Sequence, residues 1–135
     1  MIELQSQIEN KEYKLIDLEN KLKPLGYVVG GGWEYDHGYF DYKIDEDEQG
    51  YLFLRLPFTS VDGELDTKGV QVRLGRPFLL AHNFEAGLDH TNSDDPNPLF
   101  NQFSAPVDPD GKFPEEFINT GKEYLEELEQ VILYD

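Results

Sequence analysis

The segment YLFLRLPF, residues 51–58, constrains the fold of this chain more than any other feature. Apart from Arg55 it consists of apolar residues and one proline, so both of its alternating faces are apolar. A run of this length is too short to span a membrane as a helix, and it is typical of a strand that is covered on both faces. The segment therefore predicts a sheet in which residues 51–58 form a central strand.

A strand-like alternation also fills GYVVGGGWEYDHGYFDYKID, residues 26–45. We expect His37 and Gly38 to form a two-residue hairpin turn, because this register separates most aromatic side chains from the acidic ones. The three glycines at 30–32 weaken a strand, and they indicate a bulge or a close approach by another backbone. The predicted register pairs aromatic residues on one buried face: Tyr35 with Phe40, and Trp33 with Tyr42.

Helices are expected near both ends of the chain. Leucines at helical spacing predict a short helix over residues 15–25, which Pro24 helps to end. A longer helix over residues 114–134 begins with a proline and two glutamates and carries one apolar stripe. Between these helices, residues 70–85 have strand composition and form either a hairpin or one long strand with a bulge. Pro77 favours the bent or bulged strand, because proline cannot donate a hydrogen bond to a strand ladder.

These elements together predict an α+β fold, with an antiparallel sheet of about five strands. The short N-terminal helix and the long C-terminal helix are expected to pack on one face of that sheet. Residues 1–135 are expected to form a single domain. Within it, residues 86–112 show no periodicity and contain four prolines, so we expect a long irregular loop there.

The charge and composition of the chain argue against several classes of function. A formal net charge of −17 opposes binding to nucleic acids and to anionic membrane surfaces. The chain has no cysteine, which excludes disulfides, thiolate metal sites and a cysteine nucleophile. The first residues lack the basic, apolar and small-residue order of a signal peptide, so we expect a cytoplasmic location.

Several stretches of the chain resemble the YugN-like family of Bacillus and its relatives. These are the glycine-rich and aromatic segment at 26–45, the apolar run at 51–58, VDGELD at 61–66 and VRLGRPFLLAHNFEAG at 72–87. The resemblance extends over residues 15–90 and resumes in the last helix. It rests on structural motifs, a Trp-x-Tyr hairpin and a Gly-Arg-Pro-Phe turn. It implies a small cytoplasmic α+β domain, and it transfers no activity, cofactor or catalytic residue.

Arg55 and Arg73 are the leading candidates for binding residues, because both interrupt apolar strands, where a guanidinium needs a partner. In a chain with 28 acidic residues, the expected partner of each is an internal carboxylate. The sharper hypothesis is that these arginines bind a planar or anionic small molecule, together with His82, Trp33 and Tyr35. His82 alone is more typical of a core histidine with one hydrogen bond, and no metal site is expected.

The chain lacks the sequence motifs of several enzyme classes. It has no G-x-S-x-G elbow, no phosphate-binding G-x-x-x-x-G-K-[ST] loop and no dinucleotide-binding glycine motif. The predicted sheet has more apolar surface than two helices cover. We therefore expect a non-catalytic binding or interaction module that acts as a homodimer and needs no cofactor. The alternative is a small enzyme or ligand sensor, with a pocket near Arg55, Arg73 and His82 under the loop at 86–112.

Overall fold

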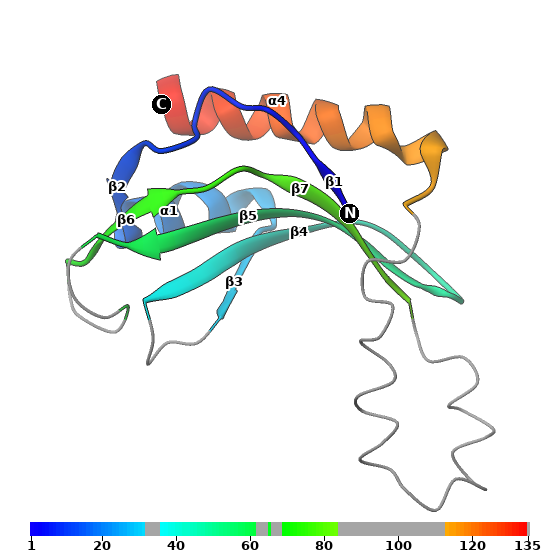
Figure 1. Cartoon of the computed structure of the whole chain (residues 1–135), viewed down its shortest axis with the longest axis horizontal. Coiled ribbons are helices and arrows are strands. Elements are labelled where there is room, and N and C mark those ends of the chain that lie inside the picture. Colours follow the sequence, from blue (N-terminus) through cyan, green and yellow to red (C-terminus); the bar gives the residue numbers. More distant parts are fainter. Residues whose placement is uncertain (32–35, 62–64, 66–68, 84–112, 135) are drawn as a thin grey trace, which may run out of the picture.

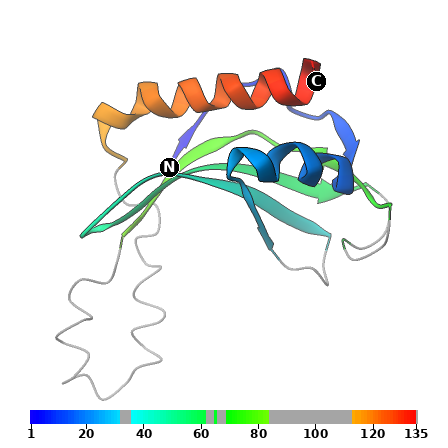
Figure 2. The same ribbon diagram turned by 180° about the vertical axis from the view of Figure 1, so that it is seen from behind.

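In the computed structural model, the chain forms one antiparallel sheet with two α-helices on one face (Figures 1 and 2). The structure describes residues 1–31, 36–61, 65, 69–83 and 113–134. Within these ranges the sheet has seven strands: β1 (Ile2–Glu3), β2 (Glu12–Lys14), β3 (Val28–Gly31), β4 (His37–Asp47), β5 (Gly50–Ser60), β6 (Gln71–Leu74) and β7 (Phe78–Asn83). Their order is β1-β7-β5-β4-β3, with β6 also beside β5 and β2 beside β6. The predicted α+β fold is confirmed. The sheet exceeds the expected five or so strands because the short β1 and β2 extend it.

The central position predicted for residues 51–58 is also confirmed. β5 pairs with β4 on one side and with both β6 and β7 on the other. Between β6 and β7, residues 75–77 lie opposite only two residues of β5, so one extra residue forms a bulge. The amide of Gly75 donates a hydrogen bond to the carbonyl of Pro57 at 2.8 Å. Residues 70–85 therefore contain the bent strand that Pro77 predicts.

The hairpin between β3 and β4 differs from the predicted one. Gly31 lies opposite Gly38, so the connection is longer than two residues, and His37 belongs to β4 rather than to a turn. Gly31 has φ +119°, and a Cβ there would lie 2.5 Å from the Cα of Gly38. The strands meet where only glycine fits, which confirms the predicted close approach and fixes the register. The aromatic pairing expected from the shorter turn is wrong, and its members Trp33 and Tyr35 lie outside the described residues.

Both predicted helices are present, and they contact one another on the same side of the sheet (Figure 2). Gly26, with φ +107°, ends the first of them in the left-handed conformation that favours glycine. Among the described residues, no helix is both long enough and apolar enough to cross a membrane. The helices are α1 (Leu15–Leu22), which continues into the 3-10 turn η1 (Lys23–Leu25), and α4 (Ile118–Tyr134), which follows the 3-10 turn η3 (Glu115–Phe117).

The hydrophobic core lies between the sheet and these two helices. α4 approaches the sheet closely, since a Cβ at Gly121 would lie 2.5 Å from a methyl carbon of Leu79. The ring of Tyr42 lies 5.2 Å from that of Tyr27 and 4.5 Å from that of Tyr124, measured between centroids. The aromatic residues on this side of β4 therefore pack between the sheet and α4. The side chains that are fully buried here include Phe40, Leu54, Leu56, Phe58, Leu79 and Leu128.

Candidate binding site

The sheet face that turns away from the helices carries a row of rings and charged groups. Side chains alternate between the two faces of a strand, and Leu54 and Leu56 of β5 are buried under the helices. The residues between them therefore point the other way, and in the described part of the chain no helix lies over them (Figure 1). We call this surface the open face. Its members are Tyr51, Phe53, Arg55 and Pro57 on β5, Tyr39, Asp41 and Lys43 on β4, Arg73 on β6, and Phe78, Leu80 and His82 on β7.

Arg55 is held at the middle of the open face by a carboxylate and a ring. Its Nε and Nη2 donate to the two carboxylate oxygens of Asp41, each at 2.8 Å. Its guanidinium carbon lies 3.9 Å from the centroid of the Tyr39 ring. The side chains of the pair are only 26 % and 14 % exposed, so the ion pair is largely desolvated. The internal carboxylate predicted for Arg55 is confirmed as Asp41.

The ring of Tyr39 also fills space that a glycine leaves. Gly30 lies directly opposite it on β3, and a Cβ at that position would come within 3.1 Å of the Tyr39 ring. The ring therefore lies over the backbone of the edge strand, an arrangement that protects an edge glycine from solvent. With Arg55 on the same ring, Tyr39 is held in place by contacts with two neighbouring strands.

A groove with a volume of about 460 Å³ runs over β3 and β4 beside this cluster. The strand register places Tyr39 at one end of it and the Tyr51 and Phe53 rings at the other. Those two rings are 5.7 Å apart between centroids. We call it the aromatic groove, and its lining residues are Gly26, Val28, Val29, Gly30, Tyr39, Asp41, Lys43, Tyr51 and Phe53.

Lys43 is the cation that lines the aromatic groove. Its Nζ lies 5.1 Å from the centroid of the Tyr51 ring and donates a 2.7 Å hydrogen bond to Glu46. That hydrogen bond raises the pKa of Lys43 above its usual value. Both members of the pair are about half exposed, at 50 % and 47 %. Exposed pairs of this kind contribute little, so Lys43 can exchange Glu46 for another anion at small cost.

Arg55, Arg73 and His82 share the open face, but the structure does not bring them together. His82 lies opposite Tyr51, and Arg73 lies opposite Thr59. A strand rises about 3.3 Å per residue, so each of these positions is about 13 Å from Arg55 along the sheet. No single pocket of the predicted kind can contain all three side chains.

Arg73 and His82 each have a different local setting. Arg73 forms an ion pair with Glu12 of β2, with Nη2 and Oε2 2.7 Å apart, and this confirms its predicted internal partner. Both side chains of the pair are exposed. His82 is half-buried on the open face, so it is not the core histidine that the sequence favours. The remaining predicted site residues, Trp33 and Tyr35, and the loop at 86–112 lie outside the described residues.

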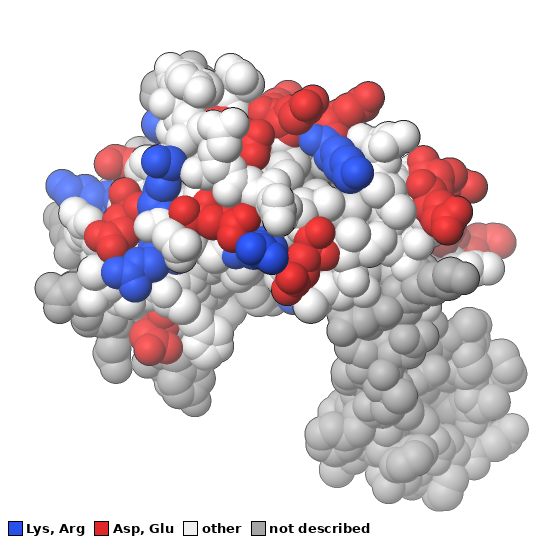
Figure 3. All heavy atoms as spheres, turned by 45° about the horizontal axis from the view of Figure 1, so that its top comes forward, with Lys and Arg blue, Asp and Glu red and all other residues white. Residues whose placement is uncertain are grey.

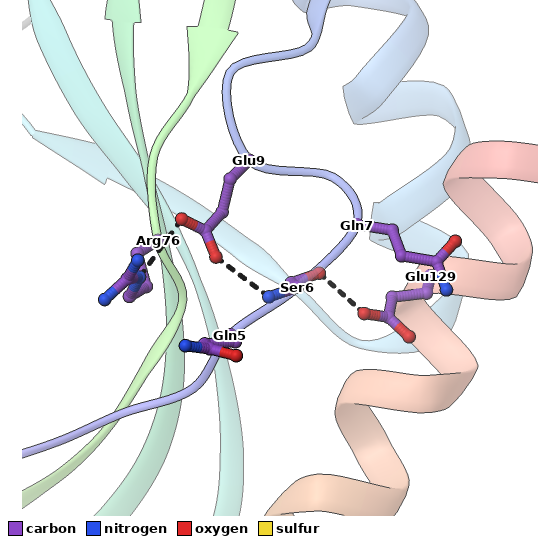
Figure 4. Close-up of a pocket in the computed structure, with 6 residues that line it drawn as sticks. All are labelled: Gln5, Ser6, Gln7, Glu9, Arg76 and Glu129. Carbon is purple, nitrogen blue, oxygen red and sulfur yellow. Dashed lines mark hydrogen bonds and ion pairs between the residues drawn. The ribbon is translucent and has the colours of Figure 1, made fainter.

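A second hollow, also of about 460 Å³, lies where the N-terminal segment passes α4 (Figure 4). Ser6 Oγ donates to a carboxylate oxygen of Glu129 at 2.6 Å, and the Ser6 amide donates to Glu9 at 2.8 Å. The other oxygen of Glu9 accepts a hydrogen bond from Arg76 Nε at 3.0 Å. The backbone donor, followed by Arg76, holds the pKa of Glu9 below its usual value. This network ties the N-terminal segment to α4 and to the bulge, which is a structural role.

Acidic side chains are spread over the face of the molecule that carries α4 (Figure 3). Seen with the α4 side brought forward, they lie among lysine and arginine side chains (Figure 3). Among the described residues, no cluster of three or more histidine, aspartate and glutamate side chains could hold a metal ion. The acidic side chains of the described residues therefore belong to a solvated surface rather than to one concentrated site.

Comparison with known proteins assigns the chain to a family. The model of the YugN-like family matches residues 3–132. The chain belongs to this family. Another YugN-like protein, "Uncharacterized protein YugN" of Bacillus subtilis strain 168, is 49% identical over 135 residues, which cover 99% of this chain and 100% of that protein. The resemblance that the sequence motifs carry is thereby confirmed.

A solved structure shares the YugN-like fold. The crystal structure of the uncharacterized conserved protein YugN from Geobacillus kaustophilus HTA426 matches with a TM-score of 0.67. The match covers 98% of this chain and 92% of that one, at 19% sequence identity. At this identity the likeness shows a common fold and nothing further. The α+β architecture of the chain agrees with it.

Proposed function

We propose that this YugN-like protein is a non-catalytic binding protein that acts as a homodimer through the open face. The observation that carries the proposal is the pair of partly exposed rings on that face, Phe78 of β7 and Phe53 of β5, which lie beside the buried Leu80. An apolar surface of this kind on a small domain is typical of an interaction site. A two-fold symmetric contact would bury the same residues of both copies against each other.

The separation of the polar residues supports a binding role over catalysis. Acid–base chemistry needs groups that converge on one reacting atom. Arg55 and Arg73 instead have separate carboxylate partners, and His82 lies at a third position on the sheet. A cytoplasmic location is part of the proposal, since a chain without cysteine gains nothing from an oxidising compartment.

The test is light scattering across a dilution series at micromolar concentration. The proposal predicts a species of twice the 15.6 kDa chain mass that dissociates on dilution. A monomer at every concentration up to about 100 μM would contradict the proposal, because stable interfaces of standard size have dissociation constants below that concentration.

A matched pair of variants locates the interface. His82→Asp adds one negative charge to the open face, and Asn83→Asp adds one to the adjacent residue, which points to the other face. Each charge is present twice in a symmetric dimer. His82→Asp should raise the dissociation constant at least tenfold, because it would bury unpaired carboxylates in the interface. Equal effects of the two variants would show that the contact lies elsewhere.

A second candidate function, a small-molecule sensor, is favoured by the aromatic groove. The groove is lined by three rings and one exposed lysine, a composition typical of ligand sites. The groove shares Phe53 with the proposed dimer contact, and its other lining residues lie away from Phe78 of β7. Calorimetry measures binding in the groove and light scattering measures dimer formation, so the two events are observed by separate methods.

A further inference from the structure

We infer that the aromatic groove binds a planar aromatic molecule carrying a single carboxylate, with its ring against Tyr39 and Phe53 and its carboxylate at Lys43. The inference rests on the second candidate function, which it deepens by naming the class of ligand. It does not depend on the proposed homodimer.

The walls of the groove are suited to a flat ring. Tyr39 is held between the guanidinium of Arg55 and the backbone of Gly30, so its orientation is set before any ligand arrives. Phe53 is packed against Tyr51 at the other end, with 5.7 Å between ring centroids. Rings that are already ordered lose little conformational entropy on binding, which favours affinity. Because Arg55 and Gly30 cover the two faces of Tyr39, an aromatic partner meets this ring at its edge, and edge-to-face contacts are a favoured arrangement of aromatic pairs.

The size of the groove limits the ligand. A volume of about 460 Å³ lies at the lower end of the range for small-molecule sites. The rings at its two ends flank positions 39 and 43 of β4, which are about 13 Å apart. This length accommodates a fused two-ring system with a short acidic arm.

The charged groups that line the groove determine whether the ligand should be an anion or a cation. Both oxygens of Asp41 accept hydrogen bonds from Arg55, so this carboxylate is neutralised within the protein. Lys43 has three donors, and its partner Glu46 does not line the groove. A ligand carboxylate can therefore replace or join Glu46 at Nζ. One lysine matches one carboxylate, whereas a polyphosphate would meet the repulsion of a chain with a net charge of −17.

The experiment compares three probes that share one ring system and differ in charge. Calorimetric titration of the full chain with indole-3-acetate, indole-3-acetamide and tryptamine measures the affinity for an anion, a neutral molecule and a cation. We expect indole-3-acetate to bind about tenfold more tightly than the amide, since a charge-assisted hydrogen bond is stronger than a neutral one. Tryptamine should bind no better than the amide. Equal affinity for the three probes, or no binding at millimolar concentration, would overturn the inference.

Variants then assign the site. Lys43→Gln should reduce the affinity for indole-3-acetate to that for the amide, and it should leave amide binding unchanged. Lys122→Gln on the exposed side of α4 makes the same change in net charge and serves as the control. Phe53→Leu keeps an apolar side chain but removes the ring, so it should weaken all three probes. Equal effects of the two lysine variants would overturn the assignment to the groove.

Light scattering on the same samples keeps this inference apart from the homodimer. A dimer that binds none of the probes would contradict the ligand inference alone. A monomer that binds indole-3-acetate through Lys43 would contradict the homodimer alone. Unfolding midpoints of each variant establish that the changes in affinity are not caused by loss of structure.

Discussion

Replacing Gly31 with alanine should destabilise the protein by about 3 kcal/mol, because two unfavourable effects fall on one residue. Its φ of +119° is a conformation that a residue with a Cβ rarely adopts, and holding one there costs about 1–3 kcal/mol. The new Cβ would also lie 2.5 Å from the Cα of Gly38. Backbone atoms cannot rotate aside, so β3 and β4 must separate locally and lose about one hydrogen bond, or ~1 kcal/mol.

Gly69→Ala is the matched control for this prediction. Gly69 has φ +79°, and a Cβ there would meet no atom within 4 Å, so only the conformational effect of about 1–2 kcal/mol applies. Urea denaturation followed by circular dichroism gives the free energy of unfolding of both variants and of the unchanged protein. Gly31→Ala should lose at least about 1 kcal/mol more than Gly69→Ala. Equal losses would refute the register that places Gly31 against Gly38.

Four further substitutions probe charged groups and one buried hydroxyl. Arg55→Ala should lower the free energy of unfolding by about 2 kcal/mol, because it leaves the largely buried carboxylate of Asp41 unpaired. Arg73→Ala should lower it by less than about 1 kcal/mol, because the ion pair of Arg73 is exposed. Urea denaturation separates these two values, and similar losses would contradict the difference in burial. Burial raises the pKa of Tyr27 well above its usual value of 10.0, so its stabilising effect is complete below pH 10.0 and is lost as the pH rises further. Tyr27→Phe should therefore unfold at higher pH in an alkaline titration followed by circular dichroism, and an unchanged midpoint would contradict this. A backbone donor and then a guanidinium lower the pKa of Glu9 from 4.5, so its stabilising effect is complete above pH 4.5 and is lost as the pH falls. Glu9→Gln should reduce the loss of stability between pH 5 and pH 3, which acid denaturation curves measure.

Elements with local periodicity could be predicted from the sequence. The apolar run at 51–58 identifies the central strand because its pattern needs no knowledge of neighbouring strands. The apolar stripe of the helix over 114–134 and the bend near Pro77 are likewise local signals. These features fix the α+β class.

The register of the β3–β4 hairpin could not be read in the same way. Alternation along the chain fits several turn lengths equally well, and the pairing of aromatic residues favoured a short turn. The register is decided by the contact between Gly31 and Gly38, which depends on φ and on space across two strands. Only the run of glycines signalled that a close approach was present.

The candidate site depends on the same cross-strand information. The sequence indicated that Arg55 needs a carboxylate, but it offered 28 acidic residues, and the β4–β5 register selects Asp41. Tyr39 and Lys43 could not be identified as site residues from the sequence, because they lie on the polar side of the alternation. Their shared position with Phe53 in one groove depends on the pairing of three strands. One sequence signal did point to this region: Tyr39 is the aromatic residue that the predicted hairpin register places on the same side as the acidic residues.

Hydroxyl-radical footprinting across a dilution series tests the central claim, the role of the open face, most directly. It measures the oxidation of individual side chains, and aromatic residues react readily. The account predicts that Phe78 and Phe53 become protected as the concentration rises, whereas Tyr134, which is 69 % exposed at the end of α4, reacts equally throughout. Oxidation of Phe78 and Phe53 that does not change with concentration would contradict the account.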